Sequence, residues 1–303
     1  MRKPAAKQIV RFQRKPGFAK IAWMTKKRVS TGIDGLDPLI EEGFLPAKSY
    51  VVTGDAGTGK TTACLQFLLK GLMNGEKGVY VTVDERPSDI LDSAASLGWD
   101  LQHYIQEKRL VILDASPYFS GRVGSVREKE VDVARIVTDL ASHIARMQAQ
   151  RLAIDPVGPL IRSDTSSGRA EEQARLLLQL LQTQLQTTNL LSSHSTSRQA
   201  QEMSSIEEFL AAGVFVLRTS RAGDKFVRTL WIKKMRGTAA EPGEYEFNIA
   251  KGKGIVLTSQ ILRSLEEGLQ PFQVMEGSSN GEQDEPVKET LQAFEPEKFP
   301  PEK

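Results

Sequence analysis

The run from Gly54 to Thr61 carries the most specific chemistry in this sequence, because it fits the phosphate-binding pattern G-x-x-x-x-G-K-T completely. Glycines in such a loop let backbone N–H groups turn toward phosphate oxygens, and the N-terminus of the following helix adds a favourable dipole. We expect Lys60 to reach the β- and γ-phosphates of a nucleotide and the Thr61 hydroxyl to coordinate Mg²⁺. The predicted phosphate-binding residues are Gly54, Asp55, Ala56, Gly57, Thr58, Gly59, Lys60, Thr61 and Thr62.

Besides the Thr61 hydroxyl, a carboxylate is expected to hold the water shell of that metal. The apolar run Arg151-Leu-Ala-Ile ends in Asp155, downstream of the loop and after an amphipathic helical pattern. An aspartate that ends a strand is often only a turn residue. In this context Thr61 and Asp155 are the predicted metal-binding residues.

Two adjacent acids follow the first strand-like run after the phosphate loop and its helix. Asp84 and Glu85 come directly after Val79–Val83, where a carboxylate near a γ-phosphate could polarise the attacking water. Alternatively, they cap the helix that begins near Pro87 and Ser88. The spacing alone does not separate a catalytic base from a capping residue.

The elements that must position these residues alternate between strand and helix. Short apolar or β-branched runs suit strands buried on both faces, and helical periodicity separates several of them. The expected strands are 50–53, 79–83, 110–113, 152–154, 190–191 and 214–217, and the expected helices include 133–147 and 170–186. The runs 226–233, 245–249 and 255–257 are separated by Gly- and Pro-containing turns, which favours C-terminal antiparallel hairpins. The pattern predicts an α/β fold with a mostly parallel central sheet and helices on both faces.

Charge divides the 303 residues into unlike segments. Residues 1–28 hold ten Lys and Arg and no acid, whereas 277–303 hold seven acids and three Lys. We expect a basic, disordered arm (1–28), an ATPase domain (29–260), a helical segment (261–276) and an acidic, disordered tail (277–303). The arm could also contact nucleic acid or an acidic partner.

Composition excludes several other classes. The sequence has no apolar run of membrane-spanning length and no signal-peptide pattern near its start. The single Cys64 offers no disulfide, and His103, His143 and His194 have no metal-ligand spacing. We expect a cytoplasmic protein.

Several motifs together resemble one copy of the domain of the KaiC family of RecA-like ATPases, over roughly residues 28–260. They are S-T-G-I-D-G-L-D (30–37), the phosphate loop, V-T-V-D-E-R-P-S-D-I (81–90), I-D (154–155), E-E-F (207–209), G-V-x-V-L-R (213–218), R-T-L-x-I-x-K-x-R-G-T (228–238) and G-E-Y-x-F-x-I (243–249). The resemblance implies a RecA-like P-loop NTPase fold.

The family resemblance also implies a function. It suggests a slow ATPase switch related to circadian clock proteins: a homo-oligomeric ring, commonly a hexamer, that binds ATP between subunits and signals to protein partners. In that family the strand-end acids activate water, which favours Glu85 and Asp84. Lys234 and Arg236 match cations that reach a neighbouring subunit's γ-phosphate, although a solvated basic strand end is the alternative.

The sequence departs from the family pattern at three positions. Lys48 replaces the second glycine of G-x-L-P-x-G, Asp84 stands where clock proteins have Glu, and His194 stands where they have an acid. His194 or Ser193 could sense the γ-phosphate, but a hydrogen-bonded strand-end histidine is favoured. Which of Asp84 and Glu85 activates water stays open.

A different function also stays open, that of a RecA- or Rad51-like recombination or repair ATPase. The basic arm and the expected channel loops 162–171 and 195–206 favour it, but these loops contain no aromatic residue for stacking on bases. Autophosphorylation of Ser204 or Ser205 is a further alternative, and the E-E-F run that follows favours hydrolysis instead.

Overall fold

The structure, a computed structural model, describes residues 27–118, 132–161, 167–194, 211–223, 225–241 and 243–258. The acidic tail, the segment 261–276 and all of the basic arm except Lys27 and Arg28 lie outside these residues. So do loop 195–206 and the E-E-F run.

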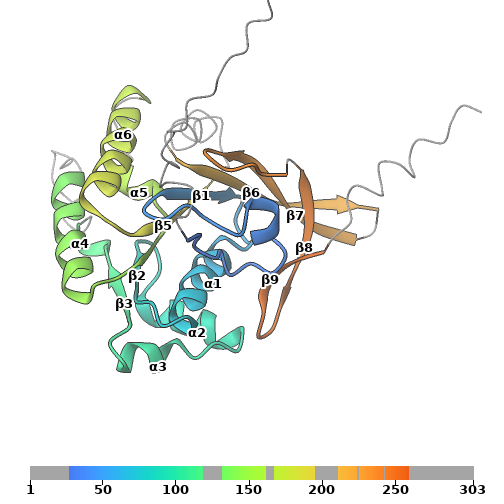
Figure 1. Cartoon of the computed structure of the whole chain (residues 1–303), viewed down its shortest axis with the longest axis horizontal. Coiled ribbons are helices and arrows are strands. Elements are labelled where there is room, and N and C mark those ends of the chain that lie inside the picture. Colours follow the sequence, from blue (N-terminus) through green and yellow to red (C-terminus); the bar gives the residue numbers. More distant parts are fainter. Residues whose placement is uncertain are drawn as a thin grey trace, which may run out of the picture. The chain divides into compact units, whose positions relative to one another are not determined.

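A nine-stranded sheet forms the centre, with the strand order β3-β2-β4-β5-β1-β6-β7-β8-β9 (Figure 1). The neighbours from β3 to β6 pair in parallel, and the pairs from β6 to β9 are antiparallel. The strands are β1 Ser49–Gly54, β2 Gly78–Thr82, β3 Leu110–Asp114, β4 Arg151–Asp155, β5 Thr188–His194, β6 Gly213–Ala222, β7 Lys225–Met235, β8 Glu244–Ala250 and β9 Gly254–Thr258. The predicted mixed sheet is confirmed, including its C-terminal antiparallel hairpins.

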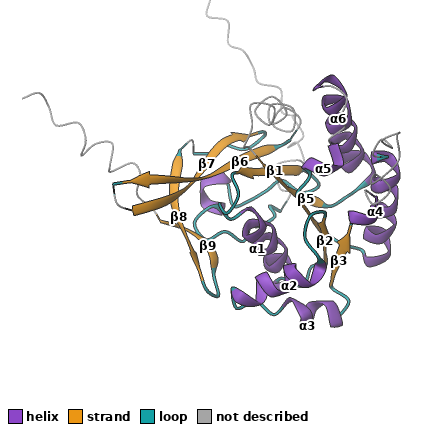
Figure 2. Ribbon diagram, turned by 180° about the vertical axis from the view of Figure 1, so that it is seen from behind, coloured by secondary structure: helices purple, strands orange, loops and turns teal. Residues whose placement is uncertain are grey.

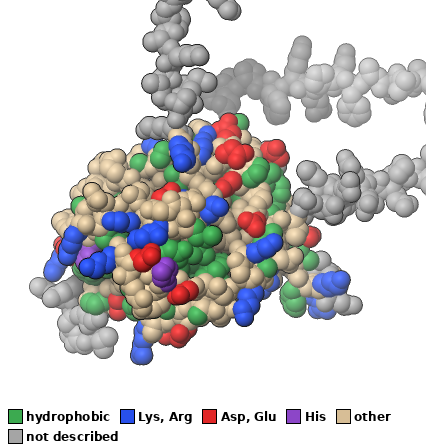
Figure 3. All heavy atoms as spheres, turned by 60° about the horizontal axis from the view of Figure 1, so that its bottom comes forward, with side chains coloured by type: hydrophobic (Ala, Val, Ile, Leu, Met, Phe, Trp, Pro, Cys, Tyr) green, Lys and Arg blue, Asp and Glu red, His purple; other side chains and the backbone are tan. Residues whose placement is uncertain are grey.

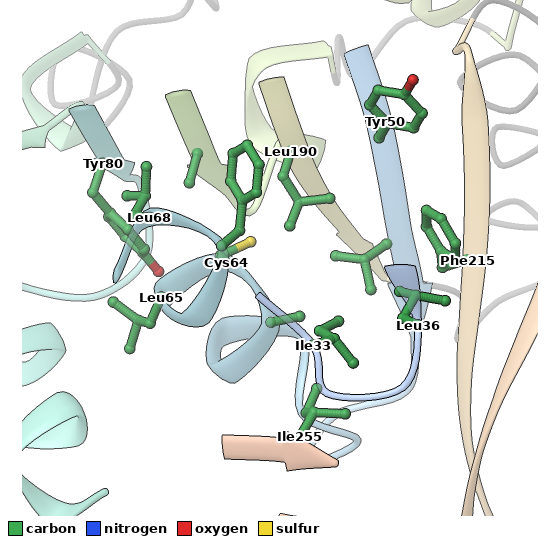
Figure 4. Close-up of a cluster of buried hydrophobic side chains, with 14 of the residues drawn as sticks. Ile33, Leu36, Tyr50, Cys64, Leu65, Leu68, Tyr80, Leu190, Phe215 and Ile255 are labelled. Carbon is green, nitrogen blue, oxygen red and sulfur yellow. The ribbon is translucent and has the colours of Figure 1, made fainter. Parts of the chain in front are cut away.

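Helices cover both faces of the sheet (Figure 2). One face packs against α1 Lys60–Met73, α2 Pro87–Ser96 and α3 Leu101–Gln106, and the other against α4 Val133–Met147, α5 Gly158–Ile161 and α6 Ser167–Gln184. Figure 4 shows Cys64 and Leu68 of α1 packed between Tyr80 of β2 on one side and Leu190 of β5 on the other. No helix in the described ranges is long and apolar enough to cross a membrane.

The helix α4 shows why its periodicity predicts it well. Its buried residues recur three or four apart, and the Asp132 side chain accepts a hydrogen bond from the Arg135 N–H (2.9 Å) at its N-terminus. The chain leaves the helix at Gln148 in a left-handed conformation (φ 57°).

The prediction of a loop over residues 162–171 was wrong for its second half. Residues 167–171 belong to α6, and 162–166 lie outside the described residues. Ser and Gly have low helix propensity in helix interiors, but the first turn of a helix tolerates both. The polar composition of this segment therefore did not reveal where α6 begins.

The motif at 30–37 closes a tight loop beside the sheet. The Asp37 carboxylate accepts hydrogen bonds from the Thr31 N–H (2.9 Å), the Thr31 hydroxyl (2.6 Å) and the Ser30 hydroxyl (2.5 Å). Asp37 also begins a short 3₁₀ helix, η2 Asp37–Ile40, which has Pro38 in its first turn and buries Ile40. The Ser, Thr and Asp of this motif therefore have a structural role.

Candidate functional site

The phosphate loop lies at the carboxyl edge of the sheet, between the end of β1 at Gly54 and the start of α1 at Lys60. A Cβ atom on Gly54 would lie only 2.3 Å from the Leu217 carbonyl oxygen of β6, so the close approach of two backbones requires glycine. Gly59, the residue before α1, has φ +108° and faces Ile249 of β8. The loop therefore turns tightly and aims the N-terminus of α1 along the carboxyl edge.

Lys60 lies on the inside of this loop. Its ammonium group donates hydrogen bonds to the carbonyl oxygens of Gly54 and Asp55, both at 2.8 Å, and its exposed fraction is 6%. Burial lowers the pKa of Lys60, while the negative charges of Asp155 and Asp55 oppose that shift. The cation thus lies beside the helix N-terminus and within electrostatic reach of Asp155.

The three threonines of the loop differ in their surroundings. Thr58 is buried, and its hydroxyl donates to the Asp55 carbonyl oxygen (2.8 Å), which braces the turn. Thr61 and Thr62 are half-buried in the first turn of α1. This is the position from which a P-loop hydroxyl meets a nucleotide-bound Mg²⁺.

Asp155 ends β4 with both carboxylate oxygens hydrogen-bonded. The Tyr80 hydroxyl donates to its Oδ2 (2.6 Å), and the Ser192 hydroxyl donates to its Oδ1. These donors come from β2 and β5, the two strands that flank β4. Two neighbouring strands therefore fix the orientation of this carboxylate, which is 8% exposed.

The sequence interpretation missed Tyr80 and Ser192. One signal was available, because a tyrosine in a fully buried strand needs a hydrogen-bond partner for its hydroxyl. The strand order that places Asp155 beside Tyr80 is not visible in the sequence. Burial and the neighbouring Asp155 raise the pKa of Tyr80 well above its ordinary value, so Tyr80 stays a hydrogen-bond donor.

Asp84 and Glu85 follow β2 at the same edge of the sheet. The segment is held by hydrogen bonds from the Thr82 hydroxyl to the Glu85 carbonyl oxygen (2.7 Å) and from the Val83 N–H to the Asp155 carbonyl oxygen (3.3 Å). Neither acid caps α2, because the N-cap residue is Arg86 and no side chain caps this end. The alternative interpretation as a helix cap is therefore wrong.

Glu85 is partly buried among other negative charges. Partial burial raises the pKa of Glu85, and the negative charges of Asp155, Asp89 and Asp84 raise it further. A carboxylate with a raised pKa is a stronger base. The raised pKa therefore suits Glu85 to the orientation and activation of water.

The donor set fits Mg²⁺ carried by a nucleotide. Mg²⁺ usually keeps several water ligands and binds through one or two protein groups plus phosphate oxygens. Thr61 supplies a hydroxyl, and Asp155 supplies a carboxylate whose orientation is fixed. No group of three or more His, Cys, Asp or Glu side chains that could hold a metal ion occurs in the described part of the chain.

Lys234 and Arg236 lie at the opposite edge of the sheet from the phosphate loop. In the register of the central strands, Gly54 pairs with Leu217 and Leu217 with Leu230, whereas Lys234 pairs with Val214 near the amino end of β1. The Arg236 N–H donates to the Ala212 carbonyl oxygen, just before β6 (2.6 Å). These cations therefore do not lie beside the phosphate loop of their own subunit.

His194 is placed beside the loop by the sheet register. It ends β5 opposite Gly54 and is half-buried. Ser204 and Ser205 lie outside the described residues, so the structure does not place the expected phosphorylation site.

Comparisons with known proteins agree with this geometry. A family model described as "ATPase: KaiC" matches residues 29–261. The chain is 35% identical over 229 residues to the circadian clock oscillator protein KaiC of Synechococcus elongatus, an alignment that covers 73% of this chain and 42% of that protein. It is 29% identical over 253 residues to the circadian clock protein KaiC3 of Synechocystis, covering 83% and 50%. The chain thus spans about half the length of the curated relatives it matches.

A solved structure of another protein shares the fold over almost the whole of that protein's chain. This is a KaiC-like protein from the hyperthermophilic archaeon Pyrococcus horikoshii, 32% identical, with a TM-score of 0.64. The match covers 77% of this chain and 99% of that one.

Proposed function

The chain belongs to the KaiC family of ATPases, and from this premise we propose that it is an oligomeric switch that binds ATP with Mg²⁺, hydrolyses it slowly and passes its nucleotide state to protein partners. One observation carries the proposal. Lys60 and Thr61 at the start of α1, Asp155 at the end of β4 and Glu85 after β2 lie together at the carboxyl edge of one sheet.

Each residue then has a distinct role at the phosphates. The backbone N–H groups of the loop and the Lys60 ammonium would bind the β- and γ-phosphates, and Thr61 and Asp155 would hold the metal and its water shell. Bound Mg²⁺ would neutralise charge on the phosphate oxygens. Glu85 orients the attacking water and accepts its proton, and Asp84 helps to raise the basicity of Glu85.

Lys234 and Arg236 complete the site from a neighbouring copy. Their distance from their own phosphate loop, at the far edge of the sheet, supports a role in trans. Cations aimed at the γ-phosphoryl group stabilise the charge that develops there during transfer. The active form is then a homo-oligomer, which we propose to be a hexameric ring in the cytoplasm.

Replacement of Lys60 by Ala tests the nucleotide site. We expect Lys60→Ala to abolish ATP binding measured by isothermal titration, whereas Lys77→Ala, a change just before β2 at the opposite edge of the sheet, should bind as the wild-type protein does. Wild-type affinity in Lys60→Ala would contradict the site assignment.

Light scattering with and without ATP–Mg²⁺ tests the switch. We expect ATP–Mg²⁺ to stabilise the ring, and Glu85→Gln, which binds ATP without activating water, to hold it in that form. An oligomeric state that does not change with nucleotide would argue against the switch and leave only a nucleotide-binding site.

A further inference from the structure

The hairpin of β6 and β7 extends beyond the rest of the sheet as a ribbon of two strands. The last β1 residue, Gly54, pairs with Leu217, and the last β8 residue that pairs with β7 lies opposite Arg228. Beyond these points the ribbon continues for three residue pairs, up to Ala222 and Lys225, with no third strand among the described residues. Figures 1 and 2 show it projecting from the sheet. A two-stranded ribbon is at most marginally stable alone, so a partner would stabilise this one.

Basic residues are concentrated on the ribbon and on the residue pairs at its base. Arg218, Arg221, Lys225 and Arg228 are all exposed, and Arg218 also contacts Glu244 (3.5 Å). The sequence of the ribbon between Arg218 and Arg228 holds only one acid, Asp224. On the face of the molecule shown in Figure 3, by contrast, basic and acidic side chains are interspersed.

Aromatic side chains accompany these cations on both faces of the β6–β7 hairpin. Phe226 is 77% exposed and lies directly across from Arg221, so the two share one face. On the other face, the Arg218 guanidinium lies 5.1 Å from the centre of the half-buried Trp231 ring. A phenylalanine this exposed contributes little to the core and is available to stack on another ring.

We propose that the β6–β7 ribbon binds single-stranded nucleic acid, with Phe226 stacking on a base and Arg221 and Arg228, which the register places on the same face, contacting phosphates. Aromatic side chains interleaved with cations are the combination that binds single strands, since every base offers a flat face and every nucleotide a negative charge. Duplex bases are already stacked on one another, so an exposed aromatic ring favours the unpaired strand. The proposal does not depend on ATP hydrolysis.

Fluorescence anisotropy of the full chain with a labelled oligothymidylate tests this. We expect Phe226→Ala to weaken binding roughly fivefold or more. Arg221→Gln with Arg228→Gln should reduce the slope of log affinity against log salt by about 1.4, that is about 0.7 for each phosphate that the protein no longer neutralises. All three side chains are exposed, so these variants should fold, and thermal unfolding with the ATPase rate verifies that they do.

Controls separate the ribbon from other basic surfaces. Arg135→Gln with Arg175→Gln removes two exposed cations from α4 and α6 and should leave both affinity and salt dependence unchanged. Wild-type binding by the ribbon variants, or equal affinity of the wild-type protein for duplex and single strand, would overturn the proposal. So would a loss of self-association in the ribbon variants without any change in oligonucleotide binding, because the ribbon would then contact a second copy of this chain.

Discussion

The Asp155 carboxylate accepts hydrogen bonds from two hydroxyl groups, and this makes Tyr80 testable as a positioning residue. Tyr80→Phe removes the 2.6 Å hydrogen bond to Oδ2 and leaves the ring in its buried position. We expect the Mg²⁺ concentration for half-maximal ATPase activity to rise roughly tenfold, because residues behind a metal-binding group tune its affinity on that scale. A magnesium titration of the ATPase rate measures this.

Tyr118→Phe is the matched control for Tyr80→Phe. The Tyr118 hydroxyl also donates to an aspartate, Asp139 (2.7 Å), but Tyr118 is exposed and follows β3, which three strands of the sheet separate from β1. Its loss should leave the magnesium requirement unchanged. An equal effect of both variants would mean that Tyr80 acts only on general stability.

The raised pKa of Glu85 predicts how the ATPase rate depends on pH. Only the carboxylate form can accept a proton, so the rate should fall as the pH drops through the raised pKa, at a higher pH than for an ordinary glutamate. Asp89→Asn removes one of the charges that raise this pKa. We therefore expect the acidic limb of the rate profile to move to lower pH in this variant.

Asp92→Asn provides the comparison for Asp89→Asn. Asp92 is exposed on the same helix, α2, but does not contribute to the pKa shift of Glu85. Its profile should overlay that of the wild-type protein. If Asp89→Asn left the acidic limb in place, Glu85 would not be the group that limits the rate.

At the scale of elements, Gln66 joins the helix of the phosphate loop to two distant segments. Its side-chain amide donates to the carbonyl oxygens of Gly32 (2.7 Å), Lys253 (2.9 Å) and Ile255 (3.0 Å). Its Oε1 accepts from the Ile255 N–H (2.7 Å). One buried side chain thus connects α1 with β9 and with the loop before η2.

Gln66→Leu should therefore destabilise the fold. It leaves buried backbone groups of β9 without their partner, at a cost of about 2–4 kcal/mol in the free energy of unfolding. Urea denaturation measures the loss. Gln102→Leu, on the exposed side of α3, should cost less than about 0.5 kcal/mol. Similar values for the two variants would contradict this connecting role.

Local patterns predicted most of these elements, and long-range pairing accounts for what they missed. Every predicted strand is present, and the helix predicted at 133–147 begins and ends at those residues. Strand and helix periodicity both reflect which side chains face the core, so the sequence reveals them. The motif and its flanking patterns predicted a loop between a strand and a helix at Gly54–Lys60 and a strand that ends at Asp155, and both are present. The contacts of Tyr80, Ser192 and Gln66 join residues far apart in the chain, so only the strand order and packing reveal them.

At the scale of the whole molecule, a mixing experiment tests the proposed role of Arg236 in a neighbouring subunit's site. Lys60→Ala should be inactive because it lacks the phosphate site, and Arg236→Ala because it cannot serve its neighbour. In an equal mixture, about a quarter of the interfaces join an intact loop to an intact Arg236, so part of the ATPase activity should return. Mixing Lys60→Ala with Lys77→Ala should give the activity of the intact loops alone.

Native mass spectrometry verifies that the two inactive variants exchange subunits. If the mixture then shows no recovery of ATPase activity, Arg236 lies outside the active site. Lys234→Ala should behave as Arg236→Ala does in the same mixture. A difference between the two would identify which cation serves the neighbouring subunit.

The location of the phosphate loop and of Arg236 at opposite edges of one sheet has a consequence for symmetry. Two copies that join these edges meet head to tail, so a twofold dimer cannot complete both of its sites. An open row of n copies contains n − 1 complete sites, and only closure supplies the last one. Activity per subunit should thus increase with protein concentration and become constant once rings close, a stoichiometric signature that a monomeric ATPase lacks.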